Sequence, residues 1–119
     1  MSFERVTTRV RSLALQEVAE TKTAAKKFAA EQIALARRLV IRLGAPTGHE
    51  PDIDKLTLSF ERDFLMSRRK WLSDAVQFFR EQNQNHRENT EAVEICQIAV
   101  TMLDEEISNL TAQVGTEND

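Results

Sequence analysis

Three long stretches of this chain carry apolar residues at steps of three or four positions, the spacing that forms one face of an α-helix. They cover residues 3–43, 52–83 and 87–114. No segment alternates apolar and polar residues with a period of two, so the pattern predicts no β-strand. We therefore expect an all-α fold, an elongated antiparallel three-helix bundle that resembles a coiled coil and forms one domain, residues 1–119.

The first stretch carries one apolar stripe along its whole length. Its alanines favour a helix and let a neighbouring helix approach closely. At a rise of about 1.5 Å per residue, such a helix is a rod on the order of 60 Å long. The stripe consists of Val6, Val10, Ala14, Val18, Thr21, Ala25, Phe28, Gln32, Leu35, Leu39 and Leu43.

The connection between the first two helices is rich in helix breakers, because residues 44–51 hold two of the three glycines and both prolines. Gly44 suits the position that follows a helix, and Pro46 prevents the helix from continuing. Asp52 can cap the second helix, as Ser2 can cap the first.

The second connection is short and polar, which favours antiparallel packing of the helices that it joins. Asn85 and Glu88 have the spacing of a capping box for the third helix. Gly115 marks the end of that helix, and residues 116–119 are predicted to be a frayed tail.

The second helix carries two apolar ridges, each of which repeats every seven residues. A helix with two adjacent ridges packs against two neighbours, so we expect it in the middle of the bundle. Glu61 and Arg68 lie between the ridges. Their long side chains either extend outward or pair with neighbours, or else the two residues mark a groove open to a partner. The ridges are Phe64, Trp71 and Phe78, and Leu58, Leu65, Leu72 and Phe79.

The third helix has the most regular heptad spacing in the chain. It carries further apolar residues, Ile95, Ile98 and Met102, on another side, where Glu91 and Glu105 also fall. Burial between two neighbouring helices explains some of them, and an exposed apolar strip rimmed by acids is the alternative. The heptad consists of Val93, Cys96, Val100, Leu103, Ile107, Leu110 and Val114.

The second reading gives a set of candidate protein-binding residues. Met66 joins them as a weaker addition, because it falls opposite both ridges of the second helix, where burial within one bundle is hard to arrange. The candidates are Glu91, Ile95, Ile98, Met102, Glu105 and Met66.

The charge is distributed unevenly, although the net charge is only −3. Residues 1–43 hold nine Lys and Arg against four Glu, and residues 88–119 hold eight acids and no Lys or Arg. The first and third helices therefore either attract each other side by side or form a polarised docking surface. The basic residues surround the first helix without interleaved aromatic residues, which disfavours nucleic-acid binding.

The residues that usually carry chemistry are scattered. His49 and His86 lie in connections at opposite ends of the expected bundle, so they cannot share a metal ion. The acids of residues 104–106 point to three sides of a helix, and Cys96 occupies an apolar stripe position that predicts burial. We predict no catalytic, cofactor-binding or metal-binding residue, and hence no enzyme.

The sequence predicts no targeting segment. The first five residues lack the apolar run of a signal peptide, no 18-residue apolar stretch exists, and a single cysteine excludes an internal disulfide framework. A cytoplasmic protein is therefore expected. The acidic last helix disfavours binding to a membrane surface.

The order and relative lengths of the three helices, with a middle helix that opens on Asp52, Ile53 and Lys55 after Glu50-Pro51, resemble the tubulin-binding cofactor A family over roughly residues 5–112. The resemblance implies a cytoplasmic, cytoskeleton-associated chaperone that captures β-tubulin folding intermediates before the αβ heterodimer assembles. It implies β-tubulin as partner, with other tubulin-folding cofactors as further ones, and no nucleotide or metal.

The interpretation as a β-tubulin chaperone favours a monomer over a homodimer. The alternative function is a homo-oligomeric coiled-coil scaffold or adaptor, in which the apolar excess of the third helix is a self-association seam.

Overall fold

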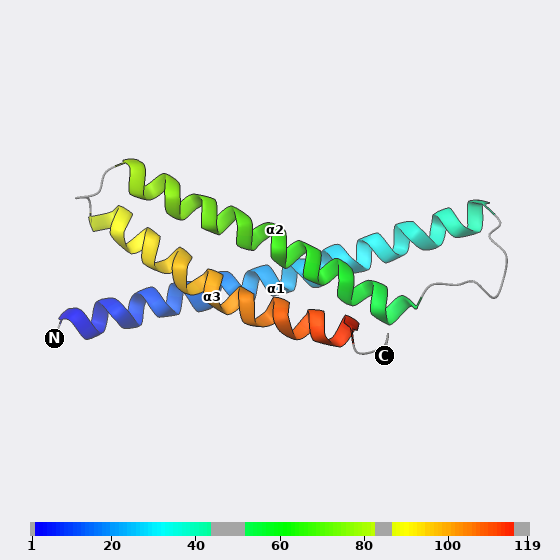
Figure 1. Ribbon diagram of the computed structural model, residues 1–119, viewed down its shortest axis with the longest axis horizontal. Coiled ribbons are helices and arrows are strands. Elements are labelled where there is room, and N and C mark those ends of the chain that lie inside the picture. Colours follow the sequence, from blue (N-terminus) through cyan, green and yellow to red (C-terminus); the bar gives the residue numbers. More distant parts are fainter. Residues whose placement is uncertain (1, 44–51, 83–86, 116–119) are drawn as a thin grey trace.

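A computed structural model shows an all-α three-helix bundle (Figure 1). It describes residues 2–43, 52–82 and 87–115, and no strand occurs among them. The predicted roles of Gly44, Pro46, Asn85, both histidines and the tail lie outside the described residues, as does the side chain of Ser2. The helices are α1 (Ser2–Leu43), α2 (Ile53–Gln82) and α3 (Arg87–Gly115).

The start of α2 follows the capping prediction. The backbone N–H of Lys55 donates to Oδ1 of Asp52 at 3.1 Å, and the N–H of Leu56 donates to the Asp52 carbonyl at 2.9 Å. Asp52 therefore satisfies amide groups that the first turn of a helix leaves without intrahelical acceptors.

Ion pairs and aromatic contacts give the direction of each helix. Arg9 and Lys22 of α1 pair with Glu91 and Glu106 of α3 in the same order along both helices, so these helices are parallel. Other contacts join α1 to α2 in reverse order, from Glu17 with Arg68 to Phe28 with Phe60, so these two helices are antiparallel.

Helix α1 does not lie along the groove between the other two helices but crosses it. Figure 1 shows α2 and α3 as a hairpin and α1 running diagonally across it, with the N-terminal part of α1 on the side of α3 and its C-terminal part on the side of α2. The molecule measures 63 × 28 × 20 Å. Its length is set by α1, which is longer than either hairpin helix.

The core lies where the three helices cross, and small residues allow the close approach. Ala14, Ala25 and Ala29 of α1 and Ala99 of α3 are fully or almost fully buried. Thr21 is the one buried polar residue among those described, and its hydroxyl donates to the Glu17 carbonyl at 2.8 Å, so its burial leaves no donor unsatisfied. The central cluster comprises Val18, Ala25, Leu65, Leu72, Cys96, Ala99, Leu103 and Leu110.

The predicted heptad of α3 and one ridge of α2 are confirmed. Cys96, Leu103 and Leu110 are buried, and Val100 and Ile107 pack against them. On α2, Leu65 and Leu72 are buried, while Leu58 and Phe79 pack partly buried at the margins of the cluster.

The prediction that the other ridge of α2 is buried is wrong for its last two residues. Phe64 packs against the core and contacts Phe28 of α1, but Trp71 is 57% exposed and Phe78 is 55% exposed. The reason is the crossing of α1, which covers the ridge near Phe64 and has moved to α3 at the level of Arg9.

The end of the predicted α1 stripe is also wrong, because Leu35 and Leu39 are almost half exposed. Phe28 of α1 lies against Phe60, which is seven residues from the start of α2 at Ile53. Seven residues beyond Phe28, α1 has therefore passed the end of its antiparallel neighbour.

Candidate protein-binding surfaces

The apolar residues predicted on α3 lie on a flank that α1 partly covers. Ile95, Ile98 and Met102 are all intermediate in exposure, and Met102 packs against the central cluster. At one end of this flank, Glu91 is half-buried and pairs with Arg9 of α1, 3.6 Å away. Burial against α1 thus explains much of the apolar excess of α3.

Glu105 and Met66 lie in the open. Glu105 is exposed on α3, and Met66 is 50% exposed on α2. The structure therefore does not gather the predicted residues into one continuous exposed strip. Whether they bind a protein stays a prediction.

The largest exposed apolar side chains of α2 lie elsewhere, at Trp71 and Phe78, which we call the α2 ridge. They are seven residues apart, so they face the same side of the helix, about two turns from each other. Exposed aromatic side chains in pairs of this kind are typical of protein-binding surfaces, because they bury a large area with few rotatable bonds.

Arg68 links the α2 ridge to α1. Its Nε donates to Oε1 of Glu17 at 3.0 Å and a terminal nitrogen donates to the same oxygen, while its Cζ lies 4.4 Å from the centre of a Trp71 ring. The guanidinium thus covers one face of the indole and ties α2 to α1. Of the two open interpretations of Arg68, the structure confirms pairing with a neighbour.

A second exposed apolar surface lies on residues 35–42 of α1, which we call the α1 extension. Leu35 and Leu39 lie on one side of it, and Ile41, on another side, is the most exposed large apolar residue among those described. The extension also carries Arg37, Arg38 and Arg42 and no acidic residue. It is therefore both basic and apolar.

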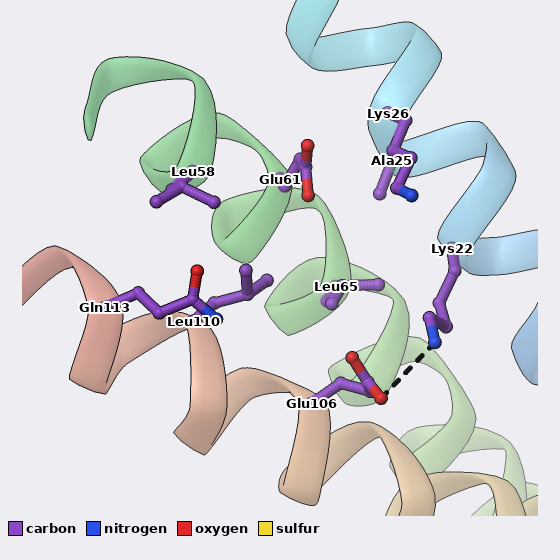
Figure 2. A pocket seen from close by; sticks show the side chains of 9 residues that line it. All are labelled: Lys22, Ala25, Lys26, Leu58, Glu61, Leu65, Glu106, Leu110 and Gln113. Carbon is purple, nitrogen blue, oxygen red and sulfur yellow. Dashed lines mark hydrogen bonds and ion pairs between the residues drawn. The ribbon is translucent and has the colours of Figure 1, made fainter. Parts of the chain in front are cut away.

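A notch of about 360 Å³ lies between the three helices where α1 turns away from α3. Figure 2 shows Lys22 of α1 bonded to Glu106 of α3 at its mouth, with Glu61 of α2 facing the same space; the Lys22 Nζ to Glu106 Oε1 distance is 3.3 Å. Ala25, Leu65 and Leu110 form an apolar floor. Glu61 therefore lines a groove, and whether a partner occupies that groove stays a prediction.

The predicted burial of Cys96 is confirmed. Burial raises the pKa of its thiol, the negative charge of Glu17 raises this pKa further, and Arg68 opposes the shift. A raised pKa keeps the sulfur protonated at neutral pH, and a protonated thiol is a poor nucleophile.

Neither a metal site nor a membrane-spanning helix is found among the described residues. No three His, Cys, Asp or Glu side chains of residues 2–43, 52–82 and 87–115 are grouped so that they could hold a metal ion. None of the three helices combines the length and the apolar composition needed to cross a membrane.

Comparisons of the chain with known protein families, with curated proteins and with solved structures find no match.

The α2 ridge and the α1 extension were missed by sequence reasoning, although one signal for them was present. The apolar stripe of the first helix runs for about 60 Å, whereas the 30 residues of α2 span only about 45 Å. A stripe longer than its neighbours leaves part of itself uncovered. The crossing angle, which exposes Trp71 and Phe78, has no comparable signal in the periodicity.

Proposed function

We propose that this chain is a non-catalytic protein that binds another polypeptide along its helix faces, and that its client is β-tubulin. The observation that carries the first part is the exposure of eight large apolar side chains, which are Leu13, Leu15, Leu35, Leu39, Ile41, Met66, Trp71 and Phe78. A single isolated apolar residue on a surface needs no explanation, but paired aromatic residues and a basic apolar helix end favour binding surfaces.

The second part rests on the resemblance of the helix order, the helix lengths and the residues Asp52, Ile53 and Lys55 to tubulin-binding cofactor A. A cytoplasmic, cytoskeleton-associated location and contacts with other tubulin-folding cofactors belong to the same proposal. The proposal requires a stable complex with β-tubulin and none with α-tubulin.

Size-exclusion chromatography of the purified chain with each isolated tubulin tests this client. We expect the chain to elute with β-tubulin and separately from α-tubulin. Separate elution from both, or equal association with both, would overturn the proposal of a β-tubulin client.

A matched pair of variants tests the predicted contact at Met66. Met66→Ser is expected to weaken the complex, whereas Gln97→Ser, which shortens an exposed polar side chain of α3 outside the eight apolar residues, is expected to leave it intact. Both side chains are exposed, so helicity measured by circular dichroism should stay nearly unchanged in both variants. If the two variants bind equally well, Met66 is not part of the binding site.

The scaffold function remains the second candidate. It is favoured by the two uncovered surfaces at the ends of the molecule, which are better placed for self-association than the predicted seam on α3, because α1 already covers part of that seam.

A further inference from the structure

The α1 extension and the α2 ridge lie at opposite ends of the molecule. Helices α1 and α2 are antiparallel, so the C-terminal end of each lies at a different end of the 63 Å long axis. Figure 1 shows the C-terminal end of α1 at one end of the bundle and that of α2 at the other.

Both surfaces exist for the same reason, since the diagonal path of α1 leaves its own end beyond the hairpin and uncovers the C-terminal half of α2. Inside one chain, α1 covers α2 where Phe28 contacts Phe60 and Phe64. The α1 extension and the α2 ridge thus continue the apolar faces that form the α1–α2 contact inside one chain, but neither is covered there.

The charges around the two surfaces are opposite in sign. The extension holds Arg38 and Arg42, each three residues after an exposed leucine. The ridge has exposed Asp74 and Glu81, each three residues after an aromatic residue. Lys70 pairs with Asp74 at 2.8 Å, so Glu81 carries the net acidic charge on this side of the ridge. Across a shallow notch of about 260 Å³ beside Arg68, α1 adds two acids, of which Glu17 is paired with Arg68 and Glu20 is exposed.

We infer that the occupant of these surfaces is a second copy of this chain. A two-fold axis perpendicular to the long axis places the α1 extension of each protomer on the α2 ridge of its partner. Such an interface is closed, because the same pair of surfaces meets twice and none is left over. The inference departs from the monomer expected from sequence and does not rest on β-tubulin as a client.

Sedimentation equilibrium of the purified chain is the first test. We expect a species of about 27 kDa, twice the 13.6 kDa of one chain. A single 13.6 kDa species at every concentration would overturn the inference. Because no tubulin is present, this result is separate from the outcome of the client experiment.

Charge reversal locates the interface. Arg38→Glu with Arg42→Glu is expected to raise the dissociation constant of the dimer by at least about tenfold, because the acids around the α2 ridge then repel the extension. Lys26→Glu with Lys27→Glu changes the charge by the same amount on the same helix outside the extension and should leave the dimer intact. A dimer that weakens equally in both variants contradicts the proposed site.

A disulfide experiment tests the geometry independently of any loss of association. In a Cys96→Ala background, chains with Leu39→Cys are mixed with chains carrying Phe78→Cys and oxidised. We expect a disulfide-linked dimer from the mixture and little from either variant alone, because identical residues lie far apart across the two-fold axis. Equal cross-linking in all three samples would overturn the arrangement.

Discussion

The middle of this bundle and its two ends carry the same kinds of side chain, but they differ in how many helices surround each one. In the middle, Leu103 and Leu72 are enclosed by three helices and almost completely buried. Toward the ends, Trp71 and Leu39 belong to equally regular apolar patterns and remain about half exposed. Apolar periodicity therefore shows which side of a helix is available for packing, and the path of the neighbouring helix decides how much of that side is used.

The largest difference between the two regions is expected from truncating one large residue in each. Leu103→Ala should lower the free energy of unfolding by about 2–5 kcal/mol, because the fully buried side chain leaves a cavity. Trp71→Ala should cost less than about 1 kcal/mol, mostly from its contact with Arg68. Urea denaturation measures both values, at a concentration where the chain is monomeric. A loss at Trp71 as large as that at Leu103 would contradict the exposed ridge.

Enlarging a residue at the crossing tests the close approach of the helices. Ala99 is fully buried on α3, so Ala99→Leu should overpack the core and cost about 1–3 kcal/mol. Ala112 is exposed on the same helix, and Ala112→Leu should change stability little. Thermal unfolding of the two variants gives the comparison. Similar melting temperatures would mean that the helices separate easily.

The ion pair between Glu17 and Arg68, which links α1 to the α2 ridge, should contribute less to the free energy of unfolding. Glu17→Gln removes the charge that holds Arg68 but keeps the shape of the side chain, and we expect a loss of about 1 kcal/mol because the pair is partly screened by solvent. Glu20→Gln, on the exposed side of α1, is the matched control and should be nearly neutral. Added salt should narrow the difference between the variants.

The smallest expected effect is a pH dependence from Cys96. Its pKa is raised above the ordinary 9.0 in the folded protein, mainly by burial and then by Glu17, so above that pH the folded state holds a proton that the unfolded state releases. This contribution to stability is fully present below pH 9.0 and is lost as the pH rises through the folded-state pKa. The unfolding free energy of the wild type should then fall more steeply than that of Cys96→Ala. If the unfolding free energies of the two proteins had the same pH dependence, the pKa of the Cys96 thiol would not be raised by folding.

Most of the fold could be predicted because the relevant signals are local. Asp52 caps its helix through neighbouring amide groups, and the regular steps from Cys96 to Leu110 require only a helix and one apolar neighbour. The helix ends, the all-α class and the pairing of α1 with α3 follow from composition and spacing of this kind.

The surfaces could be predicted less well because they depend on an angle between helices. The periodicity of Ile98 and Met102 is compatible with exposure, and only the position of α1 shows that α1 partly covers that flank. Conversely, Trp71 repeats in register with Phe64, and nothing in the spacing shows that α1 covers one and leaves the other exposed.

The overhang of α1 also has a kinetic consequence. A helical segment without lateral neighbours opens and closes nearly as an isolated peptide does, on a timescale of about a microsecond or less. In the monomer, amide hydrogens around Leu39 should therefore exchange with deuterium long before those around Val18, although both belong to one continuous helix. A partner that binds this end of α1 would slow the exchange of these amide hydrogens, so exchange rates would locate its binding site without a structure of the complex.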